Sequence, residues 1–113
     1  MSESANDTPN DVAGSAASHC YVDALLAWPK SDAWKYGKAC HLMIDAMTPI
    51  DILHEFASRI GMKRSWFQVS ASGVPHYDLT ARRRAMAVRL GAVEVDRIKT
   101  VEIMRGWRVA SST

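Results

Sequence analysis

The sequence lacks the features that mark membrane, secreted and disulfide-rich proteins. No apolar run approaches the roughly 18 residues that a membrane-spanning helix requires. The first residues carry acids in place of the basic start and apolar stretch of a secretory signal. The two cysteines, Cys20 and Cys40, have no CxxC spacing, which predicts reduced, partly buried thiols rather than a zinc motif or a disulfide framework. These absences predict a cytoplasmic protein without a membrane partner.

Signatures of common enzyme classes are also missing. The chain contains no P-loop, GxGxxG, HExxH, GxSxG or EF-hand motif. Their absence argues against the commonest nucleotide-binding and zinc-protease classes. It leaves open the cofactor, the oligomeric state and whether the protein is an enzyme.

The residues that are present fit one packed domain with an uneven distribution of charge. The 113 residues are 48% hydrophobic and 23% charged, with a net charge of +2. Residues 1–18 hold three acids and no base, so we expect a disordered tail followed by a single domain over residues 19–113. Residues 59–113 hold eleven basic and four acidic residues. This basic half is compatible with an anionic partner, although a basic surface often serves only to solvate a face.

Hydrophobic periodicity predicts that strands alternate with helices. Strands are expected over 20–22, 39–45, 65–69, 76–79 and 92–95, and helices over 50–60 and 81–90. Residues 24–38 fit an ordered loop held by Trp28, Trp34 and Tyr36, and residues 97–109 fit a helix or a strand. This order indicates an α/β fold, a single compact domain with a small sheet and two or three helices in two or three layers.

Both predicted helices have recognisable ends. Thr48 is the expected N-cap of the first helix, in a capping-box-like Thr-Pro-Ile-Asp segment, and Gly61 is its expected stop. Thr80 and Gly91 take the same positions in the second helix. The residues expected to face the core are Ile50, Leu53, Phe56, Ala57 and Ile60 in the first helix and Ala85, Met86 and Val88 in the second.

Histidines and carboxylates stand at positions where two strands can bring them together. The alternation of a strand places His76 and Asp78 on one face and Tyr77 on the other, and His41 and Asp45 share a face in the same way. We expect His41, Asp45, His76 and Asp78 to gather in one pocket, where they could hold a metal ion or act as acid and base groups. The alternative is that both histidines are hydrogen-bonded core residues and that Asp78 pairs with nearby arginines. The spacing matches no zinc motif.

A basic cluster opens the second helix. Arg82, Arg83 and Arg84 stand in its first turn, where each charge opposes the helix dipole by about 0.3 to 1 kcal/mol. A bound phosphate would offset this cost, and so would Asp78 with solvent.

Basic and aromatic residues adjoin just after the first helix. Lys63 and Arg64 directly precede Trp66, Phe67 and Gln68, a combination that can stack on bases and contact phosphates. Trp66 and Phe67 are also expected to belong to the core, which is the commoner place for such rings.

Several segments together resemble one family. They read YVD at 21–23, CHLMID at 40–45, LHEFA at 53–57, RSWFQ at 64–68, HYDL at 76–79 and RRRAMAVRLGAVEV at 82–95. The chain resembles the small bacterial and phage family known as domain of unknown function 4031. The resemblance implies an intracellular bacterial or phage protein and assigns no reaction. The residues that fall on its recurring motifs are His41, Asp45, His54, Trp66, Gln68, His76, Tyr77 and Asp78.

Three functions are compatible with these features. The leading hypothesis is a binding module for nucleic acid or a phosphate-bearing ligand. Its candidate ligand-binding residues are Lys63, Arg64, Arg82, Arg83, Arg84, Trp66, Gln68, Tyr77, Asp45 and His54. The first alternative is a small metal- or histidine-dependent hydrolase or transferase, with His41, His76 and Asp78 as catalytic residues. The second is a non-catalytic protein-interaction module that presents Trp28, Trp34 and Tyr36.

Overall fold

The structure, a computed structural model, describes residues 19–28, 30–31 and 34–111. The predicted tail over residues 1–18 lies outside the described residues. Within the described part the order is β1 (Cys20–Val22), β2 (Leu26–Ala27), β3 (Lys38–Ile44), α2 (Ile50–Arg59), η1 (Arg64–Trp66), β4 (Gln68–Val69), β5 (Pro75–Leu79), α3 (Ala81–Arg89), β6 (Val93–Glu94) and α4 (Arg97–Ser111). The six strands and three α-helices form one compact domain, which confirms the α/β fold.

The sheet is mixed and is organised around β3. Its order is β4-β5-β3-β1-β6, and β2 pairs with the first residues of β3. β3 runs antiparallel to both β1 and β5, whereas β6 is parallel to β1. β3 lies in the middle because it is the longest strand and is apolar on both faces, as a covered strand must be. Its register with β5 sets His41 opposite Asp78 and Leu42 opposite Tyr77.

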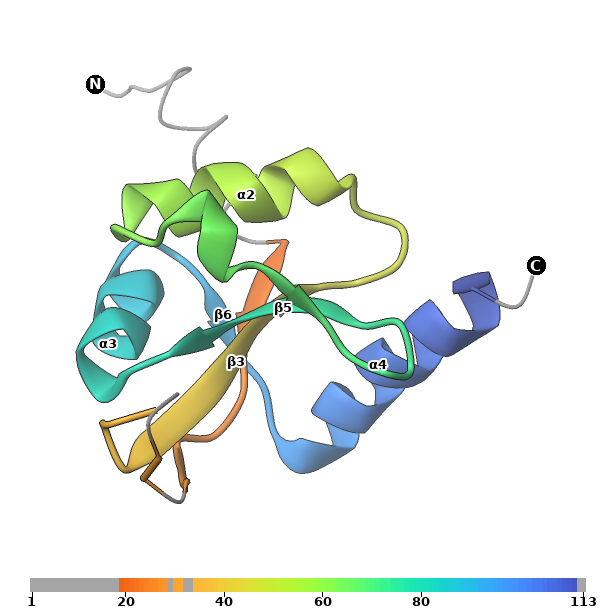
Figure 1. Cartoon of the computed structure of the whole chain (residues 1–113). Coiled ribbons are helices and arrows are strands. Elements are labelled where there is room, and N and C mark those ends of the chain that lie inside the picture. Colours follow the sequence, from red (N-terminus) through yellow and green to blue (C-terminus); the bar gives the residue numbers. More distant parts are fainter. Residues whose placement is uncertain (1–18, 29, 32–33, 112–113) are drawn as a thin grey trace, which may run out of the picture.

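Helices cover both faces of the sheet, so the domain has three layers (Figure 1). α2 and α3 lie on one side, where Phe56 and Ala87 join Leu42 and Tyr77 in the main core cluster. α4 lies on the other side, where its Trp107 Nε1 donates a hydrogen bond of 2.6 Å to the carbonyl of Ile44. The local sequence of residues 97–109 fits a helix or a strand, and in the structure these residues are helical, as part of α4.

The start of α2 differs from the capping-box prediction. No side chain caps the helix, and the Thr48 hydroxyl donates instead to Asp45 Oδ1 at 2.9 Å. Asp45 directly follows β3 and also accepts from the Met47 amide. The hydroxyl that was expected to cap the helix is therefore bonded within the turn before it. Ile50 is exposed, and the remaining predicted stripe of α2 is buried. Gly61, with φ of +83°, stops the helix as predicted.

α3 begins and ends where predicted but faces the core differently. The Thr80 side chain accepts a hydrogen bond from the Arg83 amide, which confirms the N-cap. Ala85 is exposed, contrary to prediction, and Ala87 is fully buried with Met86 and Val88 packed partly against the core. Hydrogen bonds from Arg83 to the carbonyls of Ile60 and Gly61 and from Arg84 to that of Asp23 are compatible with this rotation.

The segment before β3 is more exposed than predicted. β2 interrupts the expected loop, and Trp28 and Tyr36 are 50% and 62% exposed, so burial of these rings does not hold it in place. The Trp34 indole donates to the Lys38 carbonyl and lies edge-on to Tyr36. The expected 65–69 strand is shorter, because the η1 turn replaces its first residues, and Trp66 is exposed rather than part of the core.

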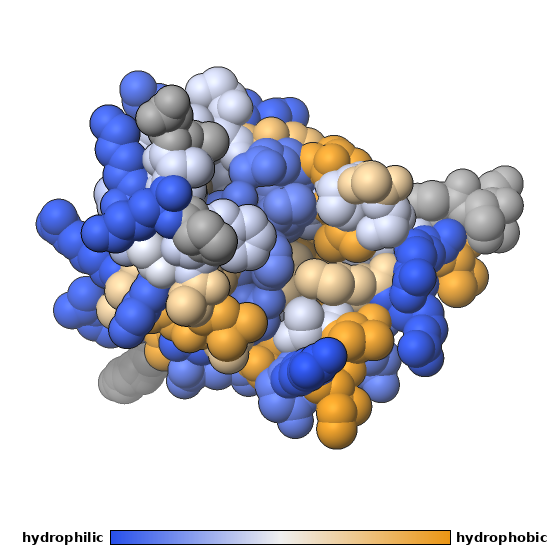
Figure 2. Space-filling view, turned by 60° about the horizontal axis from the view of Figure 1, so that its bottom comes forward, coloured by the Kyte–Doolittle hydropathy of each residue, from blue (hydrophilic) through white to orange (hydrophobic). Residues whose placement is uncertain are grey.

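Both cysteines are buried and form no disulfide. Burial raises the pKa of each thiol to about 12, so neither is a reactive thiolate at neutral pH. Over the described residues, no helix has the length and apolar character needed to cross a bilayer. Figure 2 shows the face at the bottom of Figure 1, where apolar side chains stand in separate places among hydrophilic ones.

Candidate functional site

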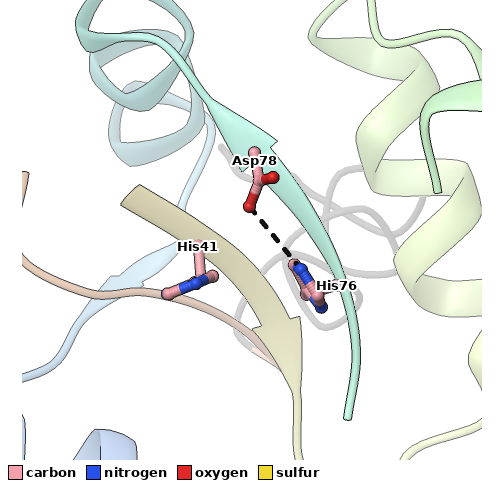
Figure 3. A group of neighbouring side chains, drawn as sticks. All are labelled: His41, His76 and Asp78. Carbon is pink, nitrogen blue, oxygen red and sulfur yellow. Dashed lines mark ion pairs between the residues drawn. The ribbon is translucent and has the colours of Figure 1, made fainter. Parts of the chain in front are cut away.

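Two neighbouring strands bring His41, His76 and Asp78 together (Figure 3). His41 on β3 pairs across the strands with Asp78 on β5, and His76 precedes Asp78 by two residues on the same face. The two imidazole rings meet edge to face with their centres 5.3 Å apart. One potential ligand atom from each of the three residues lies within 4.8 Å of the others. The predicted gathering of these three side chains is therefore present.

Asp45, the fourth expected member, lies elsewhere. It follows His41 by four residues, which at about 3.3 Å per residue puts it about 13 Å along the strand. Its carboxylate is occupied by the Thr48 hydroxyl, the Met47 amide and the Tyr21 hydroxyl. The prediction that Asp45 shares the pocket is wrong, because side chains on one face of a strand need not reach one site.

Asp23 takes the place expected for Asp45. It follows β1 directly, on the strand face that Tyr21 also occupies. Its carboxylate accepts from the His41 amide at 2.6 Å and from His41 Nδ1 at 2.7 Å. Sequence reasoning did not select Asp23, although a carboxylate at the end of an apolar strand in the Tyr-Val-Asp segment was an available signal.

Hydrogen bonds fix the orientation of all three side chains in the cluster. His76 Nδ1 lies 3.0 Å from the Val74 carbonyl, which can only accept, so this nitrogen carries a proton. Asp23 fixes His41 Nδ1 in the same way. Gln68 Nε2 donates to Asp78 Oδ2 at 2.8 Å, and Asp78 Oδ1 faces His76 Nε2 at 3.6 Å. The sequence candidates Gln68, His76 and Asp78 thus form one connected group with His41.

A pocket of about 430 Å³ opens beside this group and has Asp78 in its wall. We call it the aromatic pocket. Its lining residues are Trp34, Tyr36, Met62, Ser65, Trp66, Gln68, Asp78, Thr80 and Arg83. A smaller hollow of about 40 Å³ also has Asp78 in its wall and is lined in part by Asp23 and His41. Asp78 and Trp34 therefore border both spaces.

Residues 20–106 match the model of a family described as a protein of unknown function, DUF4031. The chain belongs to this family. No curated protein and no solved structure matches it. The bacterial or phage origin and the cytoplasmic location expected from the sequence stay predictions.

In this DUF4031 domain the three arginines of α3 have separate environments. Arg83 donates to the carbonyls of Ile60 and Gly61 at the C-terminal end of α2. Arg84 donates to the Asp23 carbonyl and to Glu94 Oε1. Carbonyl dipoles and Glu94 thus offset two of the charges, in place of the expected pairing with Asp78. Arg82 is exposed beside a second hollow that it shares with Arg83 and Tyr36.

Basic side chains of the DUF4031 domain surround the exposed ring of Trp66. Lys63 Nζ lies 5.5 Å from the ring centre of Trp66, and Cζ of Arg83 lies 5.4 Å from it. Cζ of Arg64 lies 4.9 Å from the ring centre of Phe67. Trp66 is 41% exposed and lines the aromatic pocket. The predicted neighbourhood of bases and aromatic rings is therefore present on the surface.

Like Asp45, the ligand-binding candidates Tyr77 and His54 lie away from this surface. Tyr77 is 1% exposed and points to the inner face of β5. Its hydroxyl lies 2.9 Å from His54 Nδ1, and His54 packs edge-on against Phe67. Burial, with the charge of Arg64, holds the pKa of His54 below its ordinary value. Both residues support the strand that carries His76 and Asp78 rather than line the pocket.

His41 is expected to make the stability of the domain pH-dependent. The hydrogen bond to Asp23 raises the pKa of His41, against an opposing effect of burial, and the charges of Asp23 and Asp78 raise it further. The folded state therefore favours the protonated ring. Its contribution to stability is complete below the ordinary histidine pKa of about 6.5 and is lost as the pH rises through the raised folded value.

Urea unfolding of the wild type and of His41→Gln measures this effect. The difference in unfolding free energy is expected to be largest at about pH 5.5 and to shrink toward about pH 8.5. His19→Gln, at an exposed position, is the control. A difference between wild type and His41→Gln that stays constant across this range would contradict the assignment.

Proposed function

We propose that this DUF4031 domain binds a ligand that joins an aromatic base to phosphate, a free nucleotide or a single-stranded nucleic acid, in the aromatic pocket. The observation that carries the proposal is the exposed Trp66 ring with Lys63 and Arg83 on it. A base can stack on an exposed indole, and neighbouring cations can contact the phosphate that follows.

The other walls of the pocket suit the same ligand. Tyr36 and Trp34 add two aromatic rings, set edge to face with their centres 5.0 Å apart. Gln68 donates its amide to Asp78, which leaves its carbonyl oxygen as an acceptor for the polar edge of a base. The volume of about 430 Å³ lies within the range of small-ligand sites. Trp34 and Tyr36 thus contribute to this pocket, whereas Trp28 lies outside it.

Replacing Trp66 with alanine is expected to weaken binding by about 5- to 150-fold, the equivalent of about 1–3 kcal/mol for one stacked base. The probes are adenosine monophosphate and a fluorescent single-stranded decanucleotide, measured by calorimetry and anisotropy. Binding of the oligonucleotide is expected to weaken as salt rises, because the basic side chains displace counterions. Whether the mononucleotide or only the oligonucleotide binds distinguishes the two sources of the ligand.

Trp28→Ala is the matched control, because Trp28 is also half exposed but does not line the aromatic pocket. It is expected to bind both probes as the wild type does. The proposal fails if neither probe binds at low salt, if affinity is insensitive to salt, or if Trp28→Ala weakens binding as much as Trp66→Ala.

A second candidate function is hydrolysis or group transfer on the ligand of this pocket. It is favoured by the position of Asp78 in the pocket wall and by the pair of His41 with Asp23, in which a carboxylate orients an imidazole as in general-base catalysis. The test is cleavage of the same oligonucleotide with and without divalent metal ions. An activity that survives His76→Ala unchanged would exclude this cluster as its source.

A further inference from the structure

We propose that His41, His76 and Asp78 form a binding site for one divalent transition-metal ion, held by Nε2 of both histidines and a carboxylate oxygen of Asp78. The site does not depend on what occupies the aromatic pocket. It is assembled from adjacent strands and has one open side, since the side chains of His41 and Asp78 are 32% and 27% exposed and that of His76 is 11% exposed.

Hydrogen bonds engage Nδ1 of both histidines, so Nε2 is the nitrogen of each ring that can bind a metal. The Val74 carbonyl occupies His76 Nδ1 and the Asp23 carboxylate occupies His41 Nδ1. A neutral imidazole with its proton on Nδ1 carries its lone pair on Nε2. Within the described part of the chain, no hydrogen bond is made by Nε2 of His41. Metal-binding histidines are commonly oriented in this way, by a carboxylate or carbonyl on the second nitrogen.

The contact between His76 and Asp78 also suits a shared cation. His76 Nε2 and Asp78 Oδ1 are 3.6 Å apart, which is too long for a good hydrogen bond. With the proton of His76 on Nδ1, two acceptor atoms face each other across this gap. A cation between them would accept both lone pairs, and a ring nitrogen of His41 lies near enough to become a third ligand.

The distances require only a small adjustment. Three ligand atoms bound to one ion at about 2.1 Å lie about 3.4 Å from each other in tetrahedral geometry. The present separations are at most 4.8 Å, so each ligand atom would need to move inward by less than about 1 Å. Rotations of the three side chains supply such a shift without a change in the strands.

The donor set indicates the class of metal. Two imidazole nitrogens and one carboxylate oxygen suit Zn²⁺ or Fe²⁺, whereas Mg²⁺ and Ca²⁺ prefer oxygen ligands. Three protein ligands leave at least one position for water on the exposed side. Gln68 holds Asp78 and Asp23 holds His41, so these two act as positioning residues rather than as ligands.

The test is titration of the full-length, EDTA-treated chain with Co²⁺, followed by visible absorption, and then displacement by Zn²⁺. One ion per chain is expected. Asp78→Asn and His76→Gln are each expected to lower the affinity by more than about 100-fold, and Asp23→Asn by about 10- to 100-fold through the loss of orientation of His41. Circular dichroism verifies that each variant is folded.

His19→Gln is the matched control, since it removes an exposed histidine outside the cluster and is expected to leave affinity unchanged. A measurement on the unmodified chain adds independent evidence: Zn²⁺ is expected to shift the Nε2 nuclear magnetic resonances of His41 and His76 and not that of His54. The proposal is overturned if no ion binds, if Asp78→Asn and His76→Gln bind as the wild type does, or if only His19→Gln loses binding. Nucleotide binding by the metal-free chain is measured separately, so either proposal can fail without the other.

Discussion

Tyr77→Ala is expected to lower the free energy of unfolding by about 4 kcal/mol, as for other large aromatic side chains removed from a core. Tyr77 is the largest fully buried side chain and is 1% exposed. Its ring packs beside Phe67, and its strand carries His76 and Asp78 on the opposite face. Because small domains are stable by only about 5–15 kcal/mol, this substitution is expected to loosen the strand that holds two of the three cluster residues.

Tyr77→Phe separates the ring from its hydroxyl. It keeps the packing and removes only the hydrogen bond to His54, so it is expected to cost about 1 kcal/mol. Urea unfolding at pH 7 measures both variants. If Tyr77→Phe and Tyr77→Ala lower the free energy of unfolding by the same amount, the hydroxyl and not the ring would stabilise β5. The description of the core would then be wrong.

The parts of the fold that the sequence predicts best depend on local patterns. The alternation of side chains along a strand, clear in the burial of β5, correctly places His76 and Asp78 on one face, and the same rule gives the face of His41 in β3. The positions of Thr80 and Gly61 follow from the backbone chemistry of helix ends. Such signals need no knowledge of the rest of the chain.

The sequence predictions fail where a side chain has two possible hydrogen-bond partners in different segments. Thr48 had the sequence of a helix cap, but its hydroxyl donates a hydrogen bond to the nearby carboxylate of Asp45 instead. Asp45 also lies too far along the strand to join the cluster. The sequence does not show that a carboxylate just after β1 would bind His41 instead. That outcome depends on the pairing of β1 with β3, which sequence alone does not give.

Long-range contacts also bear on which face of α3 is buried and on whether residues 97–109 form a helix. Ala85 and Ala87 are equally apolar, and the one that faces the core lies on the side of Met86 and Val88, in a helix whose Arg83 and Arg84 bind distant carbonyls. Residues 97–109 suit a strand or a helix locally. In the structure the indole of Trp107 reaches the carbonyl of Ile44, 63 residues earlier, and this contact helps to hold the segment against the sheet as a helix.

The Asp23 carboxylate both stabilises the fold, through the His41 amide, and orients the His41 ring of the site. Its removal is therefore expected to have a large effect on stability. Asp23→Ala is expected to lower the free energy of unfolding by about 3 kcal/mol, since it removes two hydrogen bonds of a charged acceptor and leaves the His41 amide unpaired. Glu55→Ala, at an exposed position of α2, is the control and is expected to change stability by no more than about 0.5 kcal/mol.

Asp23→Asn distinguishes the structural from the orienting role of this carboxylate. Asparagine keeps one carbonyl oxygen for the His41 amide, so most of the stability should return, but its amide can no longer serve as a charged acceptor for the imidazole. The pH dependence assigned to His41 is therefore expected to weaken in Asp23→Asn even where the unfolding free energy is close to that of the wild type. Equal losses of stability in the alanine and asparagine variants would show that the bond to the imidazole, and not the bond to the backbone, accounts for the stabilising effect of Asp23. Urea unfolding across pH measures both effects, and it tests whether the residue that sequence reasoning passed over is the one that positions His41.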